Sequence, residues 1–532
     1  MAFSGAVRIT DLSDYIAPSQ ACVVALNGAP PKPDAESGVQ QLAAAGNAPA
    51  HPLSAAGQGP AMPAAAQAVT VTLHDCLACS GCITSAETVL LSHQSSMELE
   101  AKMQEPGTTV VITISAQSRS ALAAFYGLSP GETQQRLAAW LASRGVAAVL
   151  DLGTARDMAL VETAAEFIAR QGAEGQEGEA CGTPDAPGPL PMLASACPGW
   201  VCYAEKTQSE SLLPFIASTK SPQAVMGSLV KRVLAPRLGV IDPAKLYHCT
   251  VMPCYDKKLE ASRTELTLEG TQVPEVDCCL TSGELQQLLA KHGVQHLRDV
   301  ALPAGPLPSL FATPSLGPDA HHDTVPSNSL SHSLSHSFSH SAKAQVEATP
   351  GTYPLLYGLP GASGGYADFV FRTAAEQLFG RHLPPGPLPY QTLRNADFQE
   401  VLLRDEASGE VLLRCAIANG FRNIQTLMRK IRMGRCEYDY IEVMACPSGC
   451  LNGGGQIKPL PGQSPQQLLD ELDGMYHHAD VVNRHPLDNP ELKHLYNGWV
   501  EGTPASENAR RLLHTTYRKR GGQNLGVVAG DW

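Results

Sequence analysis

The chain has 532 residues, of which 43% are hydrophobic, and its formal net charge is −13. This length leaves room for two to four domains with sizeable cores. The acidic balance argues against a protein of nucleic acids or anionic membranes, which would carry a basic field. No run of 18 apolar residues appears, which argues against a transmembrane span.

The first residues resemble neither a secretory signal nor a transit peptide. No apolar stretch follows Met1, and Asp11 and Asp14 are atypical of an acid-poor transit sequence. We therefore expect a cytoplasmic protein, with the nucleus open as a second compartment. Because the cytosol keeps thiols reduced, metal ligation or plain burial explains the 15 cysteines better than disulfides do.

The first motif along the chain is the spacing Cys76-x2-Cys79-x2-Cys82. It places three thiols on one tight loop, which suits three corners of a cubane and leaves the fourth ligand to come from elsewhere. Candidates for that ligand are Cys22, His74 and His93. Structural zinc is the alternative, although it usually shows two separated Cys-x2-Cys pairs or Cys and His pairs.

Three stretches are typical of flexible inserts. Residues 28–70 are rich in Ala, Pro, Gly and Gln, and residues 172–190 are similar but shorter. Residues 302–350 contain a Ser/His near-repeat of period four at 329–340. A His-rich tract can bind metal, but a disordered, low-complexity insert is the interpretation that we favour.

Between the inserts, strand and helix patterns alternate. The expected strands are 108–114, 146–152, 190–196, 245–252 and 273–280, and the expected helices are 130–140, 156–170, 222–231 and 283–292. Further on we expect helices at 366–379 and 421–433, a hairpin of 398–404 with 410–416, a strand at 438–444, and an amphipathic helical segment at 490–520. Such alternation predicts α/β lobes.

Three of the expected strands run directly into cysteine motifs. Cys197 follows 190–196, Cys254 follows 245–252, and Cys446 with Cys450 follows 438–444. Open α/β sheets place ligand sites beyond the carboxyl ends of their strands. Four thiolates suffice for one iron–sulfur cluster, and the glycines around Cys450 allow the backbone to approach an inorganic core.

The stretches 195–200, 252–257 and 442–450 resemble the signatures of iron-only hydrogenases. The match is closer to the prelamin-A-recognition-factor-like branch, which works in cytosolic iron–sulfur protein assembly. It covers residues 3–26, most of 71–300 and about 350–532, and includes 3–12, 15–22, 197–206 and 219–223. The inserts at 28–70 and 302–350 depart from the family.

The resemblance implies an α/β fold. It has two lobes with mostly parallel sheets flanked by helices, a small N-terminal ferredoxin-like cluster module and a helical C-terminal segment. The implied division is 1–27 for the segment with Cys22, 28–70 for a disordered insert, 71–107 for the N-terminal [4Fe–4S] module, 108–301 for the first lobe, 302–350 for the Ser/His-rich disordered insert, 351–480 for the second lobe and 481–532 for the C-terminal segment.

The resemblance also implies two [4Fe–4S] clusters. The first would be held by Cys22, Cys76, Cys79 and Cys82, and the second by Cys197, Cys254, Cys446 and Cys450. The other cysteines are expected to pack in the core, as Cys commonly does. His93 and His248 are likewise expected to be structural.

One position separates two functions. True hydrogenases carry a proton-relaying Cys where this chain has Ala196, next to Cys197. Lys257 and Met252 are retained, although in hydrogenases those positions contact the binuclear iron. We weigh the lost proton donor more heavily and expect a non-catalytic assembly factor that delivers [4Fe–4S] clusters to apo-proteins. An active iron-only hydrogenase and a zinc-stabilised interaction protein remain as alternatives.

The chain ends in Gly530-Asp531-Trp532. This resembles the terminal acidic–aromatic tripeptide by which assembly clients and adaptors dock on the cytosolic targeting complex, with Gly530 in place of the usual aliphatic residue. Asp531 and Trp532 are therefore partner-binding candidates. The resemblance implies a targeting complex with a WD40 protein and an upstream scaffold NTPase as partners, with neither nucleic acid nor membrane.

Overall fold

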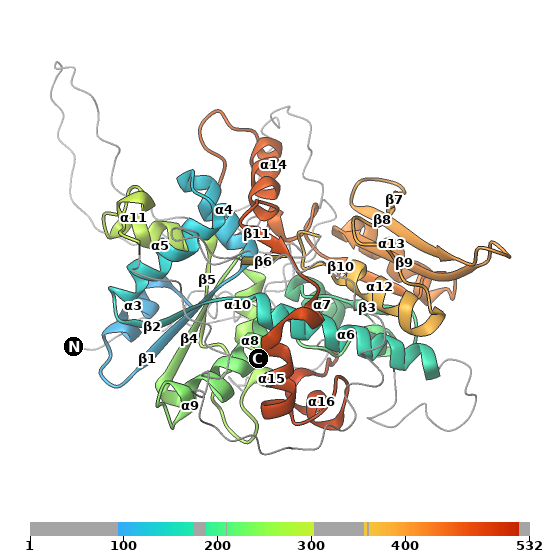
Figure 1. Cartoon of the computed structure of the whole chain (residues 1–532), viewed down its shortest axis with the longest axis horizontal. Helices are drawn as coiled ribbons and strands as arrows, with labels where there is room; N and C mark the ends of the chain where they lie inside the picture. Colours follow the sequence, from blue (N-terminus) through green and yellow to red (C-terminus); the bar gives the residue numbers. More distant parts are fainter. Residues whose placement is uncertain (1–93, 174–187, 209, 303–355, 359–360, 521–532) are drawn as a thin grey trace, which may run out of the picture.

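The computed structural model describes residues 94–173, 188–208, 210–302, 356–358 and 361–520 (Figure 1). Several predictions concern residues outside these ranges. They are the segments 1–27 and 28–70, the cysteines Cys22, Cys76, Cys79 and Cys82, the histidines His74 and His93, all of the insert 302–350 except residue 302, and Asp531 with Trp532. Among the described helices, none is long and apolar enough to cross a membrane.

The first sheet has four parallel strands in the order β2-β1-β4-β5. They are β1 (Thr109–Ile114), β2 (Val146–Asp151), β4 (Leu246–Met252) and β5 (Cys278–Thr281). Helices cover both faces, so Val110 and Ile112 pack in one core and Val111 packs in another. The β-branched run therefore predicted a buried parallel strand correctly.

Helices α4, α5 and α11 lie over one face of this sheet, and α6 and α8 lie over the other. They are α4 (Ala116–Tyr126), α5 (Pro130–Ala142), α6 (Gly153–Ala173), α8 (Pro222–Leu229) and α11 (Ser282–Lys291). The sequence sets several of their ends. Ser129 Oγ accepts from the N–H of Glu132 at the start of α5, and Thr281 forms a capping box with Glu284 at α11.

The second sheet is mixed, in the order β3-β10-β9-β8-β7. Its strands are β3 (Met192–Ala194), β7 (Gln391–Thr392), β8 (Phe398–Arg404), β9 (Val411–Asn419) and β10 (Tyr440–Met444). The strands β3, β10 and β9 are parallel to one another. Strand β8 is antiparallel to β9, and β7 is antiparallel to β8. Helix α12 (Tyr366–Phe379) and α6 pack on one face, and α7 (Pro198–Thr207) and α13 (Phe421–Arg432) pack on the other.

Strand β3 corrects one expectation about the lobes. The sequence placed residues 190–196 with the first lobe, but β3 pairs with β10 of the second sheet, and only three of its residues belong to the strand. The chain therefore crosses from the first sheet to the second and back before β4 (Figure 1). Helix α6 contributes Met158 and Phe167 to a core that both sheets share.

Other boundaries also differ from the prediction. Of the expected strand 273–280, only the part from Cys278 onward pairs with the sheet, in a strand that ends at Thr281. Pro274 has no N–H to donate to a neighbouring strand, and it forms an isolated antiparallel bridge with Thr267 instead. The expected helical segment 490–520 contains α15 (Pro490–Leu495), a π-helical turn and α16 (Glu507–Leu513), and then continues without helix. Gly502 and Pro504 interrupt it, and Glu501 has a positive φ of 52°.

The remaining elements join or cover the two lobes. They are α3 (Ser96–Gln104), a π-helical turn (Val230–Leu234) with α9 (Ala235–Arg237) after α8, α10 (Asp256–Ala261), the parallel pair β6 (Leu356–Gly358) and β11 (Val481–Asn483), and α14 (Pro465–Tyr476). Helix α14 packs against α4, where Leu472 meets Ala121.

His248 is the structural histidine that the sequence predicted, and it gives the fold a pH dependence. Its Nε2 lies 2.9 Å from Thr113 Oγ1, and its Nδ1 lies 3.2 Å from the Glu275 carbonyl oxygen. Burial lowers the pKa of His248 to about 3. The unfolded chain, with a pKa of about 6.5, binds a proton that the folded chain excludes. This residue therefore lowers stability as the pH falls below 6.5.

We expect His248 to lower the free energy of unfolding by about 1 kcal/mol between pH 7 and pH 5.5. The variant H248Q should not show this additional loss of unfolding free energy at the lower pH, as urea unfolding at both pH values can measure. Comparing the pH dependence rather than absolute stability cancels any packing loss from the substitution. H477Q, at an exposed histidine, is the control, and an unchanged pH dependence in H248Q would contradict the prediction.

Candidate functional site

The three cysteine motifs meet beyond the carboxyl ends of strands from both sheets. Cys197 follows β3, Cys254 follows β4, and Cys446 follows β10, each beyond the carboxyl end of its parallel strand. Their thiols, with that of Cys450, lie close enough to influence one another electrostatically. The structure thus brings together the four cysteines predicted for the second cluster, at the position that open α/β sheets use for ligands.

Cys197 is held between the two strands of the second sheet that carry motifs. It is 7% exposed and caps α7, where Pro198 occupies the first turn. Its N–H donates to Ser195 Oγ at 3.0 Å, and the N–H of Ala445 points at its sulfur, with 3.5 Å between N and Sγ. Because Ala445 precedes Cys446, this contact ties the first motif to the third.

The glycine triplet after Cys450 ties the third motif to the second. The N–H of Gly455 donates to the Pro253 carbonyl oxygen at 2.9 Å, beside Cys254. A Cβ at Gly453 would collide with that same oxygen, and a Cβ at Gly455 would lie 2.6 Å from Thr281 Cγ2. The sequence assigned these glycines to the approach of an inorganic core. The structure shows that they let the two loops carrying the cysteines touch each other.

Gly449 has a different reason to be glycine. Its φ is 75°, in the left-handed region, and a Cβ there would collide with Ser363 Oγ. That oxygen accepts the N–H of Cys450 at 3.1 Å. The turn between Cys446 and Cys450 is therefore fixed by a residue outside all three motifs, which sequence reasoning did not identify.

The four thiols are poor thiolates without a positive partner. Burial, with the Asp256 carboxylate and Cys450, raises the pKa of Cys197 to about 12. Burial and neighbouring acidic groups also raise the pKa values of Cys254, Cys446 and Cys450. Four such groups ionise together only when a cationic core offsets their charges, as ligating metal does. Their donor chemistry thus fits an iron–sulfur cluster.

The spacing of the thiols bears on the zinc alternative. Within residues 94–520, wherever the structure describes them, no three Cys, His, Asp or Glu residues stand close enough to hold a single metal ion. Tetrahedral zinc, with Zn–S bonds of about 2.3 Å, would need sulfurs about 3.8 Å apart. A cubane instead distributes its four cysteine ligands over several irons, so its thiols need not meet at one ion.

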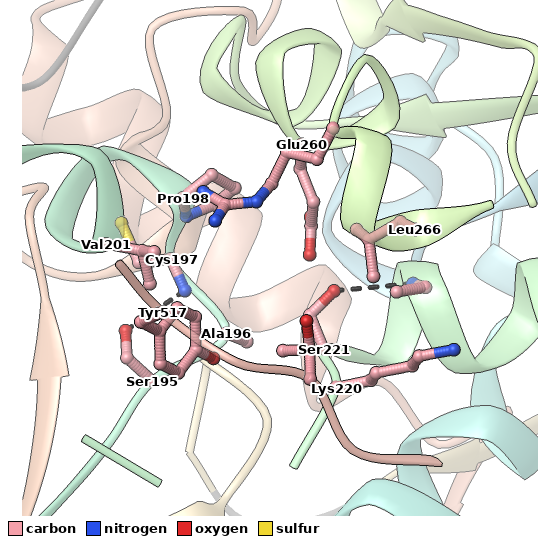
Figure 2. Close-up of a pocket in the computed structure, with 13 residues that line it drawn as sticks. Ser195, Ala196, Cys197, Pro198, Val201, Lys220, Ser221, Glu260, Leu266 and Tyr517 are labelled. Carbon is pink, nitrogen blue, oxygen red and sulfur yellow. Dashed lines mark hydrogen bonds between the residues drawn. The ribbon is translucent and has the colours of Figure 1, made fainter. Parts of the chain in front are cut away.

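A pocket opens beside Cys197 (Figure 2). Its lining includes Ala196, Cys197, Ser221, Glu260, Arg263 and Tyr517. Ala196 offers no ionisable group there. The Lys257 ammonium donates to Ser221 Oγ at 3.1 Å and also pairs with the Glu260 carboxylate. Burial works to lower the pKa of Lys257, but Glu260 and the Cys254 and Cys450 thiols raise it overall.

Residues from the C-terminal segment cover this pocket. After α16, residues 514–520 form a strap, in which Tyr517 and Thr515 line the pocket and Arg518 and Arg520 bind acidic residues beside it. The sequence noted this basic run only as the end of an amphipathic segment. Its role depends on distant residues such as Glu205, so no local pattern could have identified it.

Comparisons with known proteins agree with this geometry. A family model described as the C-terminal domain of the iron-only hydrogenase large subunit matches residues 108–454, and one for the iron hydrogenase small subunit matches 469–520. The chain is 42% identical to "Cytosolic iron-sulfur assembly component 3" of Mus musculus and 40% identical to "Protein NAR1" of Arabidopsis thaliana. Each alignment covers 97% of this chain and 96% of the relative.

Solved structures of the same fold include [FeFe]-hydrogenases. One, from work on oxygen inactivation of the enzyme, is 25% identical, with a TM-score of 0.63 over 80% of this chain and 99% of that one. An apo variant of HydA1 from Chlamydomonas reinhardtii is also 25% identical, with a TM-score of 0.60 over 82% and 100% of the two chains. Both confirm two α/β lobes of the hydrogenase type for the described residues.

Proposed function

The chain belongs to the iron-only hydrogenase family, and we propose that it acts there as an iron–sulfur cluster-binding component of cytosolic iron–sulfur protein assembly. It would link an upstream scaffold to the late targeting complex and help to deliver [4Fe–4S] clusters to apo-proteins. The convergence of Cys197, Cys254, Cys446 and Cys450 on one site carries this proposal. The names of the full-length relatives, which are assembly components, support it.

Two [4Fe–4S] clusters are proposed as the bound groups. Cys197, Cys254, Cys446 and Cys450 would hold one, and Cys22, Cys76, Cys79 and Cys82, outside the described residues, would hold the other. When bound, such clusters supply electron storage and can themselves be cargo. The chain's own residues supply four thiolates, and the Ala445 N–H beside Cys197 adds a donor to sulfur.

We propose that the chain is not a hydrogenase. Ala196 has no proton to relay at the pocket beside Cys197. Lys257, retained from the family pattern, is occupied by Glu260 and Ser221. Met252 is 2% exposed and packs with Ala261 and Val276, among other core residues, so its retention is explained by packing. These contacts give Lys257 and Met252 structural roles that do not require a binuclear iron site.

The proposed partners follow from the family resemblance. They are a targeting complex that includes a WD40 protein, which Asp531 and Trp532 would bind, and a scaffold NTPase. We place the protein in the cytosol and propose the nucleus as a second compartment. Neither nucleic acid nor membrane has a part in this function.

Iron and sulfide analysis of anaerobically purified protein tests the cofactors. We expect about eight irons and eight sulfides per chain, as two cubanes require. The same sample should evolve no hydrogen with a strong reductant and show no infrared bands of iron-bound carbonyl or cyanide. Stoichiometric zinc without iron would refute the proposal, and those bands would establish a hydrogenase.

Depletion of the protein from cells tests its role. We expect cytosolic [4Fe–4S] enzymes to lose activity while mitochondrial ones keep it, and the natural chain to restore them. An A196C variant should restore them equally well, because the proposal gives this position no catalytic part. Undiminished cytosolic [4Fe–4S] enzymes after depletion would contradict the proposal.

A further inference from the structure

The solvent side of α13 carries a local concentration of positive charge that the proposed function has not used. Residues 421–435 contain five Arg or Lys residues and no Asp or Glu, in a chain whose net charge is −13. We call them the basic face. It consists of Arg422, Arg429, Lys430, Arg432 and Arg435. Lys430 is half-buried, and the four arginines are exposed.

The basic face is rigid because the opposite side of α13 is buried. Ile424, Leu427 and Met428 are at most 2% exposed and pack with residues of β10 in the core of the second lobe. Arg422, Arg429 and Arg432 follow at intervals of seven and three residues, which places them along one side of the helix. The packing of the buried side of α13 therefore fixes where these three arginines lie on the protein surface.

Most of these cations are uncompensated. Arg422, Arg429, Lys430 and Arg435 form no ion pair with any carboxylate in the described part of the chain. Arg372 in α12, by contrast, pairs with Asp368 one turn away, at 2.8 Å. Like charges at such spacings repel within an isolated helix. A surface of unpaired cations is electrostatically complementary to an acidic partner, and this complementarity favours association with that partner.

The basic face continues into the C-terminal strap. The Arg432 guanidinium donates to Gln208 Oε1, and the Lys519 ammonium donates to the carbonyl oxygen of the same Gln208. Beyond Lys519, the Arg518 side chain is 57% exposed. These bonds connect α13 to the strap through Gln208 at the end of α7, and in the strap Arg518 itself pairs with Glu265.

The other end of the basic face adjoins the loop of Cys446 and Cys450. The N–H of Gly420, just before α13, donates to the Met444 carbonyl oxygen at 2.8 Å. Pro447 and Ser448 of that loop are exposed. A protein seated on α13 would therefore also reach the loop that carries two of the proposed cluster ligands.

We propose that the basic face is a docking surface for an acidic surface of a partner protein. This inference deepens the proposed function, on which it rests, by naming the place and charge of the partner's contact. Met433, 51% exposed, lies among the arginines. Arginine beside exposed methionine is typical of protein interfaces. Nucleic acid fits less well, because its extended charge would meet the field of a chain with net charge −13.

The test uses the full, iron-loaded chain and a fluorescent 15-residue peptide of Glu and Asp, followed by anisotropy at low and raised salt. We expect binding that weakens with salt. The variant R422E/R429E should bind the peptide at least about tenfold more weakly. K245E/K493E makes the same change in net charge at two exposed lysines elsewhere, and it should stay within about twofold of the natural chain.

Equal weakening by both variants would overturn the proposal, because the effect would then come from net charge rather than from this face. So would an absence of peptide binding, or a 15-base-pair DNA duplex that binds more tightly than the peptide. R422Q/R429Q, which adds no negative charge, should weaken binding in the same direction and guards against misfolding. Measuring the iron content distinguishes a failure of this proposal from a failure of the proposed function. A chain that holds about eight irons but does not bind the peptide would overturn only the docking surface.

Discussion

The variant C446S is expected to contain about half of the natural iron and to unfold several kcal/mol more easily. The half-buried Cys446 thiol lies beside three others, and burial together with Cys197, Asp256 and Cys450 raises its pKa. Metal binding at such a site is coupled to folding, since the unfolded chain has no preformed ligand set. Serine at this position leaves three thiolates, too few for a cubane held by four.

Iron analysis and chemical unfolding under anaerobic conditions measure both effects. Cys436 lies outside the site and is half-buried, so C436S should retain all of its iron and serves as the control. C79S should also lose about half of the iron, and C79S combined with C446S should lose nearly all. A C446S protein with unchanged iron would show that the four convergent thiols are not ligands.

The sequence predicted the site better than it predicted the path of the chain. Cys254 and Cys446 each follow an apolar run long enough to be read as a strand, so β4, β10 and their loops were expected at nearly correct positions. Strand β3 has only three paired residues. Nothing in so short a segment specifies which sheet it will join, because that depends on β10, almost 250 residues later.

The contacts that shape the site were less predictable than its ligands. Ser363 fixes the Cys450 turn and Tyr517 covers the pocket beside Cys197, yet neither lies in a motif. The glycines near Cys450 were recognisable as positions of close approach, but the approaching group proved to be Pro253. Local pattern can show that a side chain is excluded, whereas the identity of the neighbour depends on tertiary packing.

Glu205 joins three segments that are distant in sequence. It lies in α7 with 0% exposure, and its carboxylate accepts two bonds from the Arg263 guanidinium, at 2.8 and 3.0 Å. It also lies 3.1 Å from Arg520 Nε and accepts the N–H of Arg518 at 3.2 Å. One buried carboxylate thus holds the strap and the loop after α10 against α7.

We expect E205A to lose about 3–5 kcal/mol of unfolding free energy, because the buried Arg263 guanidinium would lose two close hydrogen bonds and would have to share Glu265 with Arg520. The control is E269A. Glu269 pairs with Arg511 at 3.0 Å, but both side chains are more than half exposed, so its loss should cost at most about 1 kcal/mol. Urea unfolding of the iron-loaded proteins measures the difference.

The same substitution should also loosen the strap. Trypsin cleaves after Arg518, Lys519 and Arg520, and the first and last of these are bound at Glu205. Cleavage there should therefore be faster in E205A than in E269A, under conditions where both remain folded. If the two variants lose the same stability and are cut at the same rate, the buried pair does not hold the strap. The cover over the pocket beside Cys197 must then depend on other contacts, such as the bond from the Thr515 N–H to the Ser218 carbonyl oxygen.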